Sequence, residues 1–319
     1  MAQNFWQKLK NKGQPILALA PLAGFTDSAF RQICKFYGAD VLYSEMASAA
    51  ALFYKQKDRA STTLKFLKFQ HRQEKYYVVQ LFGANPEHFA VATSLVTKYI
   101  KPDGIDINFG CPVPKIVKQG AGSGLMSNLI VARQVIQAVL DNTNLPVSIK
   151  IRAGVKTINA LEFLKNINDL PLAAVMIHGR TLQQGFAGEP DWELIKKARP
   201  YFKGVILANG GINSLASAKR ALKLSRADGL GLARGILGRP WLFKEIKSDR
   251  EINLKPQQIF KIALKQAALV QKQKGKLGII ELRKHLVWYL SGLPGASKVR
   301  EKLVKVNSLS DIKKILSKV

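Results

Sequence analysis

The chain has 319 residues, of which 47% are hydrophobic, which excludes wholesale disorder and leaves room for one large domain plus a small one. It carries 50 Lys and Arg against 21 Asp and Glu, a formal net charge of +29, which favours a polyanionic partner such as nucleic acid unless a generally lysine-rich proteome explains the excess. No apolar run reaches the roughly 20 residues that span a bilayer, the N-terminal residues lack a signal-peptide core, and the two cysteines form no disulfide framework, so we expect a cytoplasmic protein away from membranes.

Eight short apolar runs follow one another along the chain, separated by amphipathic stretches. The runs lie at 16–20, 40–43, 77–82, 104–109, 147–151, 174–178, 205–209 and 229–233, and helical periodicity is clearest over 86–99, 130–140, 160–168, 192–198 and 215–224. Such nearly continuous apolar character is typical of parallel strands that are covered on both faces. Eight strand–helix units over about 240 residues match a (β/α)8 TIM barrel in number and length. An open, doubly wound sheet is the main competitor, but residues 21–27 lack the glycine-rich turn that such a sheet carries after its first strand.

The last part of the chain differs from the rest, because residues 245–319 show helical periodicity and no clear strand. Counted from Lys244 to Val319, this part has 18 Lys and Arg and 6 Asp and Glu, a net charge of about +12. We therefore divide the chain into a TIM barrel at 1–244 and a small basic helical domain at 245–319. Arg283 and Lys284 are its candidates for nucleic-acid contact, although a basic helical face is often only a solvated surface.

One cysteine stands at the exit of the fourth predicted strand, in the turn Gly110-Cys111-Pro112. The carboxyl ends of barrel strands are where such proteins keep their chemistry, so this position favours a functional thiol. A free cysteine is more usually a small buried hydrophobe, and that alternative stays open for Cys111. Cys34 fits the alternative better, because it lies in a stretch with helical apolar spacing. Asn108, three residues before Cys111, would lie close to the thiol and could hold a substrate base.

Most of the other predicted strands also end in polar residues. These are Glu45 after the second, Gln80 in the third, Lys150 and Arg152 in the fifth, His178 and Arg180 at the sixth, Asn209 at the seventh and Arg234 after the eighth. Because buried polar groups are costly without partners, we expect a polar ligand at that face. Gly210, Gly211 and Arg234 match the phosphate site that a barrel builds after its last two strands.

Lys150 and Gln80 would then bind another part of the same ligand. A flavin ring has carbonyl groups and nitrogens that accept hydrogen bonds, and a nearby cation stabilises its anionic reduced form, which suits Lys150. The alternatives are a structural ion pair for Lys150 and a satisfied core histidine for His178.

The chain resembles the tRNA-dihydrouridine synthases, most closely their bacterial B-type branch. The segments that carry the resemblance cover residues 16–300 in order and are Ala20-Pro21-Leu22-Ala23-Gly24-Phe25-Thr26-Asp27, Val79-Gln80-Leu81-Phe82-Gly83, Asp106-Ile107-Asn108-Phe109-Gly110-Cys111-Pro112, Gly120-Ala121-Gly122-Ser123-Gly124-Leu125-Met126, Ser148-Ile149-Lys150-Ile151-Arg152, His178-Gly179-Arg180-Thr181, Asn209-Gly210-Gly211-Ile212, Gly238-Arg239-Pro240-Trp241, Arg283-Lys284-His285 and Gly292-Leu293-Pro294-Gly295. Any one of these segments is weak evidence for the resemblance, whereas all of them in this order are highly specific for the family.

The resemblance implies FMN as cofactor and NADPH (or NADH) as reductant. The implied FMN-binding residues are Pro21, Leu22, Ala23, Gln80, Lys150, His178, Asn209, Gly210, Gly211, Ala233 and Arg234. Hydride would pass to C6 of a uracil ring, and Cys111 would act as the general acid that protonates C5. The family usually has glycine where this chain has Ala233, and the extra methyl group could push the phosphate slightly outward.

The resemblance also implies tRNA as the partner. Asn108 would hold the uracil, Arg152 and Arg180 would contact base or phosphate, and Arg283 and Lys284 would belong to a helical domain that grips the folded tRNA. The target uridine, expected in the D-loop, must leave its stacked position to reach the mouth of a barrel. We expect a monomer without a metal site.

Two other interpretations remain open. One is an FMN barrel that acts on a small molecule, like a dihydroorotate dehydrogenase or an ene-reductase, although such a substrate does not require a basic helical domain. The other is an RNA-binding protein without enzymatic activity, against which the set of flavin-site residues argues.

Overall fold

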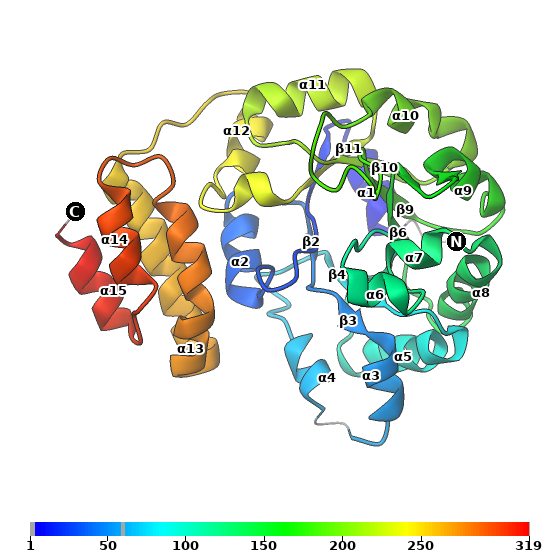
Figure 1. Ribbon diagram of the computed structural model, residues 1–319, viewed down its shortest axis with the longest axis horizontal. Coiled ribbons are helices and arrows are strands. Elements are labelled where there is room, and N and C mark those ends of the chain that lie inside the picture. The colour runs from blue at the N-terminus through cyan, green and yellow to red at the C-terminus, as the bar shows by residue number, and fades with distance from the viewer. Residues whose placement is uncertain (1–3, 59–60, 319) are drawn as a thin grey trace.

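The computed structural model describes residues 4–58 and 61–318 and contains a closed barrel of parallel strands (Figure 1). The strands run in the order β2-β1-β11-β10-β9-β6-β5-β4, and β4 pairs with β2 to close the barrel. Their bounds are β1 Ile16–Leu19, β2 Val41–Tyr43, β4 Tyr77–Phe82, β5 Gly104–Asn108, β6 Val147–Arg152, β9 Ala174–His178, β10 Val205–Asn209 and β11 Gly229–Leu232. All eight predicted strands are present, so the TIM barrel is confirmed and the open sheet is excluded.

Three short strands lie outside the eight. β3 (Ala47–Ser48) extends the sheet beside β4, and β7 (Gly154–Val155) pairs with β8 (Ile158–Asn159) as an antiparallel hairpin directly after β6. The sequence did not indicate them, because two residues are too few to show a period.

The helices that cover the barrel alternate with its strands. They are α2 Ser28–Phe36, α3 Ala49–Tyr54, α4 Thr62–Phe66, α5 Pro86–Tyr99, α6 Pro114–Lys118, α7 Ser123–Met126, α8 Leu129–Leu140, α9 Ala160–Asn166, α10 Trp192–Lys197, α11 Leu215–Ser225 and α12 Leu242–Ser248, with 3-10 turns at η1 Arg199–Tyr201 and η2 Arg234–Ile236. The five predicted helices correspond to α5 and α8–α11. Asn85 caps α5 by accepting from the backbone of Glu87 and His88, with Pro86 at the first helical position.

The amino-terminal end of the barrel is closed by α1 (Phe5–Lys10). Its buried side chains Phe5, Trp6 and Leu9 pack against the residues that fill the barrel, such as Met176 and Leu207. Access to the barrel is therefore left at the opposite end, where the strands finish.

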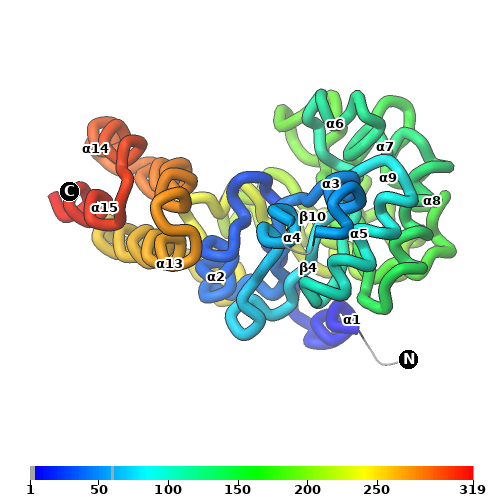
Figure 2. Tube along the Cα trace, turned by 90° about the horizontal axis from the view of Figure 1, so that it is seen from below, coloured from blue at the N-terminus to red at the C-terminus, as the bar shows by residue number. Residues whose placement is uncertain are grey.

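The C-terminal helices form a bundle beside the barrel (Figures 1 and 2). They are α13 (Pro256–Tyr289), which bends at the non-helical Gly275, α14 (Ala296–Leu303) and α15 (Leu309–Leu316). The bundle has its own apolar core, and Ala29 and Ile33 of α2 belong to that core. α2 therefore joins the two parts of the molecule. No helix in the part of the chain described is long and apolar enough to cross a membrane.

Candidate functional site

A cavity of about 830 Å³ opens at the carboxyl ends of the barrel strands. Every barrel residue proposed from the sequence as a flavin, base or acid residue lines it: Pro21, Leu22, Ala23, Gln80, Asn108, Cys111, Lys150, Arg152, His178, Arg180, Asn209, Gly210, Gly211, Ala233 and Arg234. These residues come from all parts of the barrel and meet because its strands are parallel and end on one face. Arg283 and Lys284 do not line the cavity.

The walls of this cavity are cationic. Among the described residues that line it are five Lys and Arg side chains and no Asp or Glu; the five are Lys150, Arg152, Arg180, Arg234 and Arg239. Arg239 is paired with the buried carboxylate of Glu245 at 2.8 Å, and the other four form no ion pair within the described residues. Positive charge without a partner at a concave, partly apolar surface concentrates anionic ligands. The cavity therefore suits a ligand with several phosphate or carbonyl groups.

Cys111 is held at the cavity by its own backbone. The side-chain oxygen of Asn108 accepts from the N–H groups of Gly110 (3.1 Å) and Cys111 (2.9 Å), and Ser123 donates its N–H to the carbonyl of Cys111 (3.1 Å). Burial is the largest influence on the thiol and raises its pKa, against a smaller lowering by the Val113 N–H and by Arg152 and Lys150. The thiol therefore keeps its proton at neutral pH, as a proton donor must and a nucleophile must not.

A chain of buried side chains runs beneath Cys111. Asn108 donates to the Gln80 oxygen (2.8 Å), Gln80 donates to one oxygen of Asp106 (2.7 Å), and Ser148 donates to the other (2.6 Å). Burial raises the pKa of Asp106 to about 7, although these hydrogen bonds work against the shift. The chain fixes the orientation of both amides, so the Asn108 oxygen faces the backbone of the Cys111 turn. Asp106 was not proposed as a site residue from the sequence. Its position as a carboxylate inside an apolar strand pattern could have indicated it.

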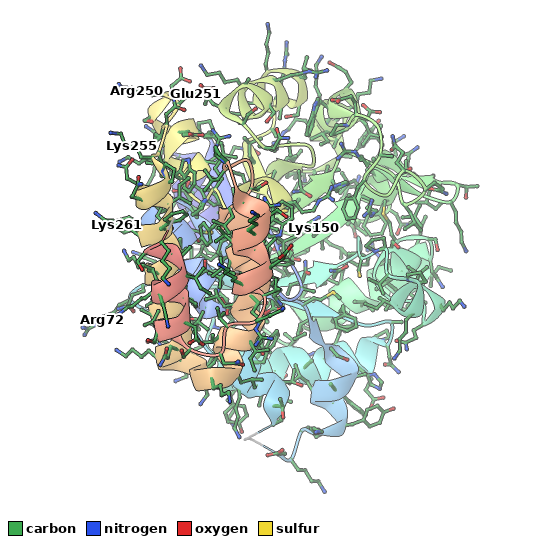
Figure 3. The ribbon with its side chains drawn as sticks, turned by 60° about the vertical axis from the view of Figure 1, so that its left-hand side comes forward. Arg72, Lys150, Arg250, Glu251, Lys255 and Lys261 are labelled. Carbon is green, nitrogen blue, oxygen red and sulfur yellow. The ribbon has the colours of Figure 1, made fainter. Side chains whose placement is uncertain are left out.

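Lys150 lies beside the barrel strands (Figure 3), where it is half-buried and lines the cavity. Its Nζ donates to the Asn209 side-chain oxygen at 3.1 Å, and Asn209 donates in turn to the carbonyl of Gly231 at 2.7 Å. Burial, followed by the charge of Arg152, lowers the pKa of Lys150 to about 8. Within residues 4–58 and 61–318 it forms no ion pair, so its charge is available to a ligand.

The turn after β10 and the turn after β11 form a cradle of backbone N–H groups. Gly210 and Gly211 have φ of +109° and +63°, a region that side chains disfavour. The N–H groups of Gly210, Gly211 and Arg234 donate to no acceptor in the described parts of the chain. Together with the Arg234 guanidinium, they present the donors that a phosphate group accepts from.

His178 is neutral in this surrounding. Burial, and then the charges of Lys150 and Arg152, lower its pKa far below the ordinary value. Its Nδ1 accepts from the N–H of Arg180 (3.3 Å), which leaves the proton on Nε2, on the side of Gly210. His178 can therefore donate one hydrogen bond into the cavity.

The two inner arginines hold the loop that follows β9. Arg152 donates to the carbonyls of Gly110 (2.8 Å), Thr181 (3.0 Å) and Gly185 (3.2 Å). Arg180 donates from Nε to the carbonyl of Gly188 (2.8 Å). Part of each guanidinium is therefore used to shape the rim, and only the remaining N–H groups are free for a ligand.

The two basic residues proposed in the helical region lie elsewhere. Arg283 donates to the carbonyl of Val306 (2.9 Å) and to the Asn307 side chain (3.0 Å), so it holds the bundle together. The Nζ of Lys284 lies 5.2 Å from the centre of the Phe25 ring, in the loop between β1 and α2. Lys284 is exposed at the seam between barrel and bundle, and Arg283 is largely occupied by internal contacts.

Several residues that line the cavity were not indicated by the sequence. Phe186 lies under the Arg234 guanidinium, whose carbon is 3.8 Å from the ring centre. Trp241, Ile259, Trp288 and Tyr289 form an apolar wall contributed by the C-terminal part of the chain. No pattern of charge or spacing marks such residues before the fold is known. Among the residues described, no group of three or more His, Cys, Asp or Glu is placed to hold a metal ion.

The fold and the cavity define a TIM-barrel protein whose strand ends, together with a C-terminal helical bundle, line one cavity with cationic walls. Solved structures with this fold include morphinone reductase in complex with tetrahydroNAD (TM-score 0.53, 13% identity, covering 76% of this chain and 90% of that one). Another is the old yellow enzyme homologue from Zymomonas mobilis (TM-score 0.52, 12% identity, covering 75% and 90%).

Comparison of sequences identifies the family of the chain more specifically than comparison of folds does. The family model described as "Dihydrouridine synthase (Dus)" matches residues 18–319. Relatives include tRNA-dihydrouridine synthase B from Pasteurella multocida, 35% identical over 296 residues (90% of this chain, 86% of the relative). A probable tRNA-dihydrouridine synthase from Aquifex aeolicus is 29% identical over 307 residues, with 95% of both chains covered. The chain belongs to the dihydrouridine synthase family, which confirms the resemblance seen in its motifs.

Proposed function

We propose that this protein is an FMN-dependent tRNA-dihydrouridine synthase that uses NADPH and Cys111 to reduce uridines of tRNA, those of the D-loop in particular. The observation that carries the proposal is the Cys111 thiol, which burial keeps protonated. It lines the same cavity as Asn108 and five cationic side chains, with no carboxylate among the described lining residues. The names of the relatives supply the substrate class, tRNA.

FMN fits the residues of this cavity. The free N–H groups of Gly210, Gly211 and Arg234 suit its phosphate. Gln80 and Lys150 suit the ring, since Lys150 forms no ion pair among the described residues and would stabilise a negative charge near it. When bound, reduced FMN supplies the hydride for the C5–C6 double bond of uracil.

The protein's own residues would supply the rest of the reaction. Asn108 holds the backbone of the Cys111 turn and can orient the base at the same time. Cys111 donates its proton to C5 of the uracil, and the thiolate formed would be stabilised by the charges of Arg152 and Lys150. The basic helical part, residues 245–319, would bind the folded tRNA through its phosphates.

The proposal is tested with purified protein, an unmodified tRNA transcript and NADPH, with dihydrouridine measured by mass spectrometry. We expect dihydrouridine in the wild-type reaction. Cys111→Ala should retain bound FMN and NADPH oxidation and lose most uridine reduction, at least about a hundredfold. Absence of dihydrouridine in the wild-type reaction, or turnover of dihydroorotate instead, would reject the proposed substrate. Equal uridine reduction by Cys111→Ala would remove Cys111 from the mechanism.

A further inference from the structure

The cavity has a second half that the proposed chemistry does not use. Besides the polar strand ends, its lining includes Trp241, Ile259, Trp288 and Tyr289 from the C-terminal part of the chain. Trp241 and Tyr289 are buried, with 7% and 3% exposure, whereas Trp288 is 40% exposed. Trp288 is therefore a cavity-lining residue whose large aromatic side chain is not covered by the rest of the described chain.

The backbone of Trp288 is held firmly in this position. Gly238 packs so closely that a Cβ there would lie 2.2 Å from the Trp288 carbonyl oxygen. That oxygen also accepts the N–H of Ser291 at 3.0 Å. The neighbouring Tyr289 donates its hydroxyl to Gln266 at 2.7 Å, which ties the end of α13 to its first half. The exposed ring is thus carried by rigid elements from both the barrel and the bundle.

The charge of the cavity indicates what covers the ring. Its five cations and the lack of a carboxylate among the described lining residues suit a polyanion, and the volume of about 830 Å³ lies towards the upper end of the range for a single small ligand. A uridine bound at Cys111 is linked to its neighbours by phosphates, so an adjacent nucleotide must lie at the mouth of the same cavity. Proteins commonly hold unpaired bases by stacking them on exposed aromatic rings.

We propose that Trp288 is a stacking platform for the nucleotide next to the target uridine. The proposal rests on the proposed function, because it takes the RNA strand to be the substrate. It assigns the bundle a direct part in positioning the substrate strand, in addition to the phosphate contacts expected of its lysines. The competing occupant is the nicotinamide reductant, and the experiments below distinguish the two.

The first experiment uses the intrinsic fluorescence of the wild-type holoenzyme. The chain has four tryptophans, and Trp6, Trp192 and Trp241 are only 0%, 6% and 7% exposed, so acrylamide quenches Trp288 selectively. An unmodified tRNA transcript should protect this fluorescence from acrylamide, and NADP⁺ should not. Protection by NADP⁺ but not by tRNA would overturn the proposal that Trp288 stacks on a nucleotide of the substrate.

The second experiment separates the two substrates kinetically. Trp288→Ala should raise the KM for tRNA about ten- to hundredfold while the KM for NADPH and the content of FMN stay unchanged. Trp288→Phe, which keeps an aromatic face, should restore most of the loss. Tyr54→Ala is the matched control, since Tyr54 is 77% exposed on α3 and does not line the cavity.

An unchanged KM for tRNA in Trp288→Ala would overturn the inference, as would an effect confined to NADPH. If Trp288→Ala fails to fold, the quenching experiment and Trp288→Phe decide. If the wild type makes no dihydrouridine, the proposed function fails on that result alone, and protection of Trp288 by tRNA still reports on the platform.

Discussion

At the scale of single residues, Gly122 packs directly behind the Cys111 turn. A Cβ at Gly122 would lie 2.9 Å from both the Cβ and the carbonyl oxygen of Cys111, closer than atoms of this kind approach. We predict that Gly122→Ala displaces the thiol and lowers uridine reduction about a hundredfold, because small misplacements of a reacting group cost that much. NADPH oxidation and FMN content should stay near wild type, and both are measured on the same preparation.

Gly120→Ala provides the control for backbone strain. Gly120 has φ of +71° and Gly122 has φ of +59°, so alanine at either position carries a backbone penalty, and the ψ of −125° at Gly122 places that residue outside the left-handed region. The nearest atom to a Cβ at Gly120 is the Cβ of Ala84 at 3.7 Å, which is an ordinary contact. Gly120→Ala should therefore reduce uridine far better than Gly122→Ala. Equal losses in the two variants would mean that contact with Cys111 is not what sets the effect of Gly122→Ala.

At the scale of elements, Arg31 of α2 and Glu74, before β4, form an ion pair with only 2% and 0% exposure. Arg31 also donates to the carbonyl of Thr26 at 2.7 Å, in the loop that carries the four cavity residues Ala20, Pro21, Leu22 and Ala23. Glu74→Ala would leave the Arg31 charge buried without its partner, so we predict a loss of about 3–5 kcal/mol in the free energy of unfolding. Urea denaturation followed by circular dichroism measures it.

The comparison for this prediction is an ion pair at the surface. Arg133 and Asp169 are paired while 41% and 57% exposed, so Asp169→Ala should cost less than about 1 kcal/mol. A loss for Glu74→Ala no larger than that for Asp169→Ala would contradict the role given to the buried pair.

The elements also show how far the sequence alone could lead. Polar residues at strand ends, such as Gln80, Lys150 and Asn209, could be placed together because parallel strands of a barrel finish on one face. The hydrogen bonds from Asn108 through Gln80 to Asp106 could not, since they depend on the register of β4 against β5. Trp288 could not either, because its place at the cavity depends on how the bundle packs on α2 and on the loop at Gly238.

At the scale of the whole molecule, the net charge is +29, and its basic residues differ in how close they lie to the cavity where tRNA would bind. Lys284 is exposed at the seam beside Phe25, close to the cavity, whereas Lys261 points outward from α13 on the side away from Lys150 (Figure 3). We predict that binding of unmodified tRNA weakens steeply with added salt, because phosphate contacts release counterions. Lys284→Ala should weaken binding and reduce the magnitude of the slope of log affinity against log salt by about 1, which corresponds to the loss of one phosphate contact.

Lys261→Ala is the matched control, because it removes the same charge from the same helix and should change the slope little. Both slopes are measured by titrating labelled tRNA over a series of KCl concentrations. Equal effects of the two substitutions would mean that tRNA responds to the total charge and is not held at the seam. A flat salt response of the wild type would contradict binding through phosphates altogether, and with it the reason for a basic bundle beside the cavity.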